Sequence, residues 1–151
     1  MEAVREAVLA DEERFGELMA ELMAGIVSQR GGSLLVDPDH APGGLSGLLD
    51  DHSRLVLVGT LDGVVTGVAI CHHEERAGHG RQGVFDACYV EPGARGMGLG
   101  GLLLDRATAW FESQGCVGID GVALPGDRSA KRFFEAAGFK ARMITMHRRL
   151  G

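Results

Sequence analysis

Four glycines fall among the six residues from position 96 to 101, in the run Gly96-Met97-Gly98-Leu99-Gly100-Gly101, and Arg95 precedes them. Glycine lets the backbone approach a ligand closely, and the N-terminus of a helix offers unpaired N–H groups to an anion. Apolar residues at helical spacing begin at Leu99 and continue to Phe111. Because clustered glycines disfavour folding, the turn predicts a pyrophosphate site rather than a helix start without a ligand.

The same run also fits the dinucleotide pattern G-x-G-x-x-G, and Asp120 lies 19 residues after Gly101. In a dinucleotide-binding fold, however, the glycine turn follows its strand directly. Here residues 91–95 separate the expected strand from Gly96, and a hairpin comes before it. No Gly-Lys-Ser/Thr follows, so the phosphate-loop pattern of nucleotide triphosphatases is absent as well. We therefore disfavour a nicotinamide or nucleotide site.

A carboxylate in the strand that leads into this turn is the first candidate for acid–base chemistry. Asp86 lies within the expected strand 84–90, and a carboxylate beside a reacting group can take up its proton. The alternative for Asp86 is an ion pair with Arg81 or Arg106, or exposure to solvent, and both interpretations stay open. Asp120, on the next expected strand, is the second candidate.

Residues that could bind a metal or form disulfides follow no known pattern. The expected loop 72–83 holds His72, His73, His79, Glu74 and Glu75. Their spacing matches no metal-ligand motif, and polar hairpin loops often contain such residues, so we predict no metal site. The three cysteines are odd in number, widely spaced and set among apolar neighbours, which indicates reduced thiols: Cys71, Cys88 and Cys116.

The elements that must position these residues alternate along the chain. Strands are expected at residues 3–9, 55–61, 64–71, 84–90, 117–124 and 141–149, with Asp62-Gly63 as a tight hairpin turn between the second and third. Helices are expected after the N-cap Asp11 up to Gly31-Gly32, at 45–49, from Leu99 to Gly115 with Leu102 on its apolar face, and from Asp127 to Gly138. Residues 33–53, with Pro38, Pro42 and Gly43-Gly44, are too broken for one regular element. This order predicts one domain, residues 1–151, of α+β class or an α/β three-layer arrangement around one mixed sheet.

The composition of the chain limits the kinds of molecule that it is expected to bind. Fifteen Lys and Arg residues against 21 Asp and Glu residues give a formal net charge of −6. That charge disfavours nucleic acid as a partner and mildly favours a cationic small molecule. No apolar run is long enough to span a bilayer and residues 1–14 do not resemble a signal peptide, so we expect a cytoplasmic protein without a membrane partner.

Two blocks of sequence resemble a known family. The first is Tyr89-Val90-x-Pro92-x-x-Arg95-Gly96-x-Gly98-x-Gly100, which is similar to the acetyl-CoA signature of the GNAT superfamily of N-acetyltransferases. The second is Asp127-x-x-Ala130-x-x-Phe133-Phe134-Glu135-x-x-Gly138-Phe139, which resembles the family's Asn-x-x-Ala-x-x-Phe-Tyr-Glu-x-x-Gly-Phe helix. The resemblance covers residues 55–139, and residues 1–54 match only in the order of elements. It implies a mixed, mostly antiparallel sheet flanked by helices.

The resemblance also implies a binding mode for acetyl-CoA. N–H groups from Gly96 to Gly101 would hold the pyrophosphate, and the main chain of 88–90 would pair with the pantetheine arm in a cleft where two strands splay. Asp127 stands at an Asn position that touches the pantetheine, and Phe134 stands at the position of a tyrosine acid. The residues expected at the cofactor are Cys88, Tyr89, Val90, Arg95, Gly96, Met97, Gly98, Leu99, Gly100, Gly101, Asp127 and Phe134.

The implied activity is transfer of an acetyl group from acetyl-CoA to a primary amine of a small molecule or protein. Asp86 would be the base and the N–H of Val90 the oxyanion donor, whereas Phe134 cannot donate a proton. The alternative is a non-catalytic acyl-CoA-binding regulatory module. Tyr89 is the only tyrosine, and strand alternation predicts it on the face opposite Asp86. The apolar stretch 143–146 in the last expected strand allows a homodimer.

Overall fold

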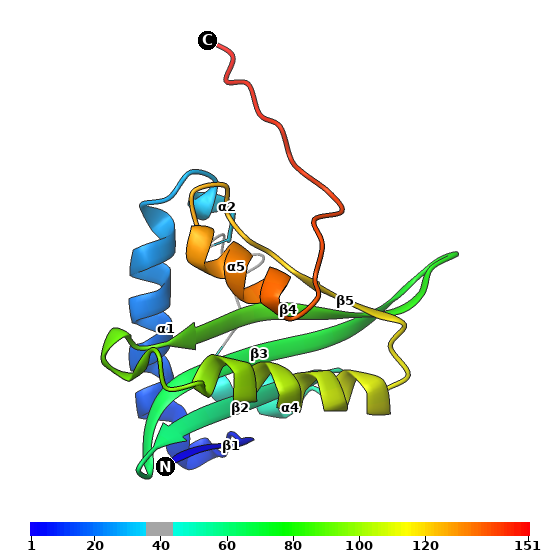
Figure 1. Ribbon diagram of the computed structural model, residues 1–151. Helices are drawn as coiled ribbons and strands as arrows, with labels where there is room; N and C mark the ends of the chain where they lie inside the picture. Colours follow the sequence, from blue (N-terminus) through cyan, green and yellow to red (C-terminus); the bar gives the residue numbers. More distant parts are fainter. Residues whose placement is uncertain (36–43) are drawn as a thin grey trace.

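The computed structural model describes residues 1–35 and 44–151, and a five-stranded mixed sheet lies at its centre (Figure 1). The strand order β1-β2-β3-β4-β5 follows the chain, with antiparallel pairing up to β4 and parallel pairing between β4 and β5. The predicted α+β fold, with a mostly antiparallel sheet flanked by helices, is confirmed. The strands are β1 Glu2–Glu6, β2 Arg54–Leu61, β3 Val64–Arg76, β4 Gly80–Val90 and β5 Gly118–Gly121.

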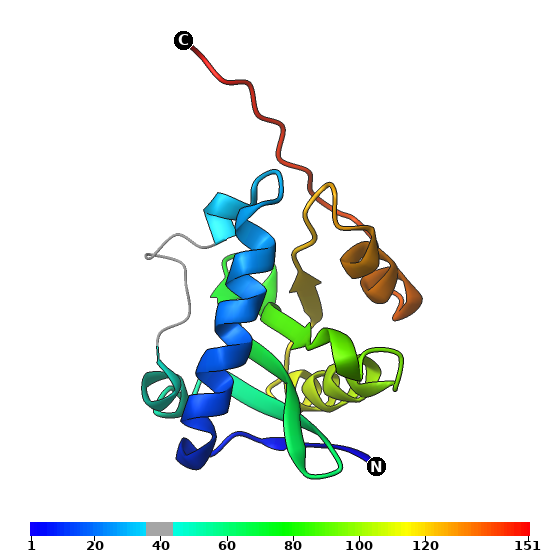
Figure 2. The ribbon, with the colours of Figure 1, turned by 90° about the vertical axis from the view of Figure 1, so that its left-hand side faces the viewer.

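Helices cover both faces of the sheet (Figure 2). On one face α1 buries Phe15 and Leu18 against even-numbered residues of β2, and α3 packs beside it. On the other face α4 buries Leu103, Ala107 and Phe111, and aromatic residues of α5 extend that core. The helical elements are η1 Leu9–Asp11, α1 Glu12–Val27, α2 Gly32–Leu35, α3 Leu45–Leu49, η2 Pro92–Ala94, α4 Leu99–Ser113 and α5 Arg128–Ala136.

The β2–β3 hairpin confirms the turn predicted from Asp62-Gly63. Asp62 has φ 50° and Gly63 has φ 83°, the left-handed values that a two-residue turn between twisted strands requires. The short helix expected at 45–49 is also confirmed as α3. Because the turn fixes the register of β2 against β3, it decides which residues of the two strands face each other.

The second hairpin differs from its prediction, because most of the expected loop 72–83 is strand. β3 continues to Arg76 and β4 begins at Gly80, so only residues 77–79 connect them. The polar residues of this stretch form cross-strand pairs instead of a loop; the Arg81 guanidinium, for example, pairs with Glu75. His72 therefore has a fixed place on the sheet.

Other boundaries shift as well. α1 ends at Val27, earlier than the predicted end at Gly31-Gly32, and Gly32 begins the separate α2. β5 is shorter than the predicted 117–124, and β1 is shorter than 3–9. The expected breakers Pro38, Pro42 and Gly43 lie outside the described residues.

The strand predicted at residues 141–149 is absent. Residues 140–151, here called the tail, form no regular element and extend away from the body of the molecule (Figures 1 and 2). The helices found in the described residues are all too short or too polar to cross a bilayer.

Candidate active site

The glycine turn links the end of β4 to the start of α4. Gly96 has φ 82° and Gly98 has φ 80°, conformations that L side chains rarely adopt. A Cβ atom built at either glycine would meet no other atom within 4 Å, so the space above the turn is open. Gly98 is the N-cap of α4, and the helix begins at Leu99.

This helix end presents unpartnered N–H groups. The bond from the N–H of Leu102 to the carbonyl of Gly98, at 3.1 Å, is the first of the helical ladder. The N–H groups of Leu99, Gly100 and Gly101 therefore have no carbonyl to bond four residues earlier within the helix. Among the residues that the structure describes, no side chain caps this end. The arrangement is suited to an anion, since the positive end of the helix dipole points at the same space.

Close packing fixes the position of the turn. Leu99 is buried against Gly59 and Gly67, where a Cβ atom would come within 2.8 Å and 3.3 Å of its side chain. Arg95 folds back, so that its Nε donates to the carbonyl of Val90 at 2.8 Å and its guanidinium lies over the ring of Tyr89. The side chain of Arg95 thus holds the turn against the end of β4.

Strands β4 and β5 part before β4 reaches this turn. Their pairing runs from Gln82 opposite Gly118 to Phe85 opposite Gly121 and stops there. β4 continues to Val90 while it pairs only with β3, among the strands described. Between Asp86 and Val90, the edge of β4 on the β5 side is therefore free to pair with an extended ligand. The fork lies beside Asp86.

A β-bulge places Asp86 on the face covered by α1. Ile70 pairs with Ala87 and Cys71 pairs with Phe85, which leaves Asp86 as the extra residue of β4. Tyr89 lies on the same face, because its hydroxyl donates to Glu21 of α1 at 3.0 Å. The prediction that Tyr89 and Asp86 occupy opposite faces is wrong, because the bulge breaks the alternation between them.

The Asp86 carboxylate is held by two residues that the sequence did not single out as its partners. Its Oδ2 accepts from His72 Nδ1 at 2.7 Å and from Arg54 at 3.2 Å, and its side chain is 21% exposed. Arg54 and His72 face each other across β2 and β3. Among the described residues, neither Arg81 nor Arg106, the expected partners, pairs with Asp86.

The hydrogen bond with Asp86 is also the main cause of a raised pKa at His72. Burial acts in the opposite direction and Arg54 also lowers the pKa, while Glu74, whose Oε2 lies 3.5 Å from His72 Nε2, raises it further. His72 and Asp86 therefore form a coupled pair at the fork. The two residues meet across β3 and β4, and the sequence does not mark the bulge in β4 that brings Asp86 to His72.

The predicted site residues on and near α5 and β5 contact neighbours of their own rather than Asp86 or His72. Asp127 caps α5 by accepting from the N–H of Ala130 at 3.0 Å, as its alternative role predicted. Phe134 packs on Gly121, where a Cβ atom would come within 2.4 Å of its ring, and contacts other aromatic rings of the core. Asp120, the second candidate base, forms ion pairs with Arg142 and Arg76.

Cysteines and the remaining histidines add no second centre among the residues described. All three cysteines are free, and burial raises the pKa of the Cys88 thiol to about 12. The ring of His73 lies against that of Trp110 at 5.5 Å between centroids. Within residues 1–35 and 44–151, no group of three or more His, Cys, Asp or Glu side chains is arranged to hold a metal ion.

Comparison with known proteins identifies the family. Residues 17–139 match the model of the acetyltransferase (GNAT) family. The chain therefore belongs to the GNAT acetyltransferase family, and the resemblance in its two sequence blocks is confirmed. A comparison with curated protein sequences gives no significant match.

Solved structures share the fold at low sequence identity. A point mutant of the BH1408 protein from Bacillus halodurans has a TM-score of 0.84 at 18% identity, with 98% of this chain and 99% of that chain covered. A ribosomal-protein-alanine N-acetyltransferase from Brucella melitensis biovar Abortus 2308 has a TM-score of 0.73 at 20% identity, with both chains covered completely. AAC(6′)-Iy, solved with the bisubstrate analogue CoA-S-monomethyl-acetylneamine, has a TM-score of 0.74 at 17% identity, with 99% of each chain covered.

Proposed function

We propose that this protein transfers the acetyl group of acetyl-CoA to a primary amine. The observation that carries the proposal is the fork after Phe85 and Gly121: the free edge of β4 runs from it to Val90, and residues 91–98 then lead to the uncapped start of α4. An extended pantetheine arm needs a strand edge, and a pyrophosphate needs N–H donors. In this chain the free strand edge comes first and the N–H donors follow it. A CoA site of this kind agrees with the family of the chain and with the CoA analogue bound to AAC(6′)-Iy.

In this binding mode the main chain of 88–90 pairs with the pantetheine, and N–H groups of 96–101 hold the pyrophosphate. Tyr89 and Arg95 contact each other next to the turn, because the Arg95 guanidinium lies over the Tyr89 ring. Asp127 caps α5 and Phe134 lies on it, and this helix approaches the start of α4, where a Cβ atom at Gly100 would meet Phe133 at 3.3 Å. Their contact with the cofactor is part of the proposal.

The Asp86 carboxylate is the proposed base. Both contacts that the structure gives it among the described residues use Oδ2, so Oδ1 is the oxygen available to an amine. Oδ1 takes the proton as the amine nitrogen attacks the thioester carbonyl, and the N–H of Val90 stabilises the oxyanion. The carbon–nitrogen bond forms, the carbon–sulfur bond breaks, and CoA leaves as a thiolate. A thiol pKa of about 8.5 lets it leave without an acid at Phe134.

The acceptor we propose is an amine on a cationic small molecule or protein, and this amine attacks in its neutral form, because an ammonium group has no lone pair. The formal charge of −6 favours such a substrate. AAC(6′)-Iy is an aminoglycoside N-acetyltransferase and the Brucella protein is a ribosomal-protein-alanine N-acetyltransferase, so proteins of this fold act on both classes.

Thermal denaturation with acetyl-CoA, desulfo-CoA, NAD and ATP at matched concentrations tests the cofactor. A ligand that binds only the folded state raises the thermal midpoint, so the CoA compounds alone should raise it. A shift with NAD and none with acetyl-CoA would overturn the proposal. Release of free CoA thiol in a screen of amines then tests turnover. CoA binding without turnover on any amine would favour the regulatory module, which the replacement of the usual tyrosine by Phe134 suggests.

A further inference from the structure

A titratable group and a permanent cation share one oxygen of the proposed base. Oδ2 of Asp86 accepts from Nδ1 of His72 at 2.7 Å and from the Arg54 guanidinium at 3.2 Å. The guanidinium is always charged in proteins, whereas imidazole ordinarily changes its charge between about pH 5 and 8. Protonation of His72 is therefore the change that alters the charge around Asp86 near neutral pH.

The charged groups around His72 come from its own strand and the two strands beside it. In β3, Oε2 of Glu74 lies 3.5 Å from Nε2 of His72. β2 contributes Arg54, whose Nε is also paired with Asp51, and β4 contributes Asp86. Among the described residues, no charged side chain of α1 or α3, which cover this face, pairs with His72. The bond to Asp86 is thus the main influence on the charge of His72.

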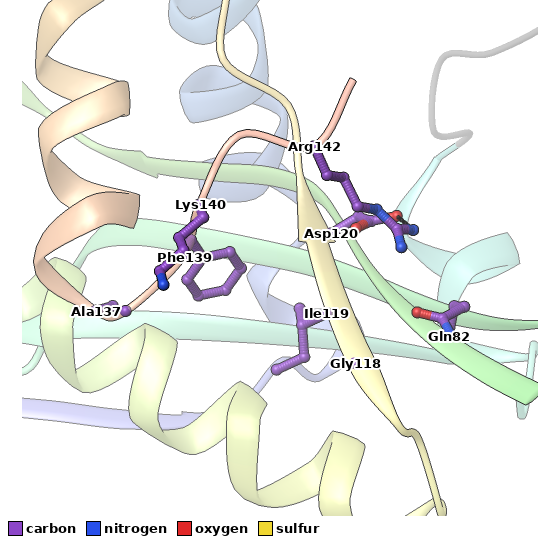
Figure 3. Close-up of a pocket in the computed structure, with 9 residues that line it drawn as sticks. Gln82, Gly118, Ile119, Asp120, Ala137, Phe139, Lys140 and Arg142 are labelled. Carbon is purple, nitrogen blue, oxygen red and sulfur yellow. Dashed lines mark hydrogen bonds and ion pairs between the residues drawn. The ribbon is translucent and has the colours of Figure 1, made fainter. Parts of the chain in front are cut away.

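The acidic residue of β5 is engaged elsewhere. Asp120 forms ion pairs with Arg142 and Arg76, and Figure 3 shows its side chain beside that of Arg142. Arg76 in turn pairs with Oε1 of Glu74, while Oε2 is the oxygen near His72. Asp120 therefore does not compete with Asp86 for the imidazole.

The neutral imidazole can hold Asp86 as well as the charged one can. A carboxylate only accepts, so Nδ1 of His72 carries a proton in both charge states. Nε2 is then the nitrogen that gains or loses a proton, and it faces Glu74. Because both ring nitrogens face carboxylates, the substrate amine meets Asp86, whose Oδ1 has no partner among the described residues.

We infer that His72 is a positioning residue for acetyl transfer: it holds Asp86 through Oδ2 in both charge states and permits fast transfer only when its own ring is neutral. The inference rests on the proposed function. A second positive charge on Oδ2 makes Oδ1 a weaker base, because an opposite charge within about 4–6 Å favours the ionised carboxylate. Loss of the Nε2 proton removes that charge without breaking the bond from Nδ1.

His72 keeps its Nδ1 proton throughout one turnover. The neutral amine attacks the thioester carbonyl carbon, its N–H proton goes to Oδ1 of Asp86, and the carbon–sulfur bond breaks to release CoA as a thiolate. Asp86, whose side chain is 21% exposed, then returns the proton to solvent. When His72 is charged, the same proton transfer cancels an ion pair and is slower for that reason.

The pH dependence of acetylation in His72→Asn tests the inference. Asn offers an N–H donor in place of Nδ1 but carries no charge. The ratio of wild-type to variant kcat/KM, measured with one amine at saturating acetyl-CoA, cancels the ionisation of that amine. This ratio should rise about threefold to tenfold from pH 6 to pH 9, as His72 loses its charge.

Glu74→Gln should move this rise without removing a contact of Asp86. Glu74 raises the pKa of His72, so the substitution should shift the midpoint of the rise, measured against the same His72→Asn reference, to lower pH. His73→Asn is the matched control, because His73 follows His72 in β3 but its ring lies against Trp110. Its kcat/KM relative to wild type should not change from pH 6 to pH 9.

Carbon-13 NMR of the histidine rings gives a readout that needs no turnover. The His72 resonances, assigned by their absence in His72→Asn, should titrate at lower pH in Asp86→Asn than in wild type, since the bond to Asp86 raises this pKa. An unchanged His72 midpoint in Asp86→Asn, or a kcat/KM ratio that stays constant with pH, would overturn this inference and leave the proposed function intact. A wild type that acetylates no amine would overturn both.

Discussion

Asp86 uses one carboxylate oxygen to hold His72 and Arg54, so a substitution that keeps the shape but removes the charge separates its roles. In Asp86→Asn, the rate of amine acetylation should fall by about 10²-fold or more, since a positioned base contributes on the order of 10²–10⁴. The thermal shift with acetyl-CoA should persist, because the cofactor contacts proposed here use the backbone.

Asp120→Asn is the control for this experiment. Asp120 lies on the neighbouring strand and forms ion pairs with Arg76 and Arg142. Its replacement should leave the acetylation rate within a few-fold of wild type. If Asp120→Asn abolishes activity and Asp86→Asn does not, the base is assigned to the wrong strand.

The His72–Asp86 pair also predicts how stability depends on pH. Asp86 raises the pKa of His72 above its ordinary value of about 6.5. A raised pKa in the folded state stabilises the protein fully below about pH 6.5, and this stabilisation is lost as the pH rises through the folded pKa. The difference in unfolding free energy between wild type and His72→Gln should therefore be larger at pH 6 than at pH 9.

Urea denaturation at the two pH values measures that difference. His52→Gln serves as the control, because His52 is exposed and forms no hydrogen bond or ion pair with its imidazole in the described part of the chain. A difference that stays constant from pH 6 to pH 9 would mean that the ionised pair contributes nothing to folding.

At the residue scale, the sequence predicted backbone chemistry better than side-chain chemistry. The turn at 96–101 is recognisable because glycine itself provides the open backbone, as Gly96 and Gly98 confirm. The partners of Asp86 were not predicted, since they depend on a bulge in β4 that no residue type announces. A one-residue irregularity changes which side chains share a face, and alternation alone cannot supply it.

At the scale of elements, the seating of α4 on the sheet sets the position of the turn. In Gly59→Ala, the new Cβ atom would lie 2.8 Å from Cγ of Leu99, so either the helix or the strand must shift. Overpacking of this kind costs about 1–3 kcal/mol of unfolding free energy. Because Leu99 begins α4, the shift should also weaken acetyl-CoA binding.

Urea denaturation and CoA titration measure the two effects. Gly25→Ala is the matched control: Gly25 lies inside α1 and an added Cβ would meet nothing within 4 Å. It should raise the unfolding free energy by up to about 1 kcal/mol, the difference in helix propensity. Equal behaviour of the two variants would show that the Leu99 contact relaxes without cost.

Element types were predicted more securely than element lengths. β5 stops at Gly121 because its pairing with β4 ends at Phe85, although β4 itself continues to Val90 and the apolar pattern of β5 continues to Leu124. β3 and β4 run through a polar stretch because each supplies the other with hydrogen bonds. On α4, the predicted core residue Leu102 is 42% exposed and Leu104 is buried instead. Pairing and packing, rather than local propensity, decide these limits.

At the scale of the whole molecule, the tail is the clearest case of a strand-like sequence that forms no strand in the structure. The sequence predicts a strand at 141–149, and its residues keep a strand-like composition. A strand forms only where another strand bonds to it, and in the part of the chain that the structure describes, residues 140–151 pair with no strand. The prediction of a strand at 141–149 was wrong for this structure, because a strand-like composition does not by itself supply a partner strand.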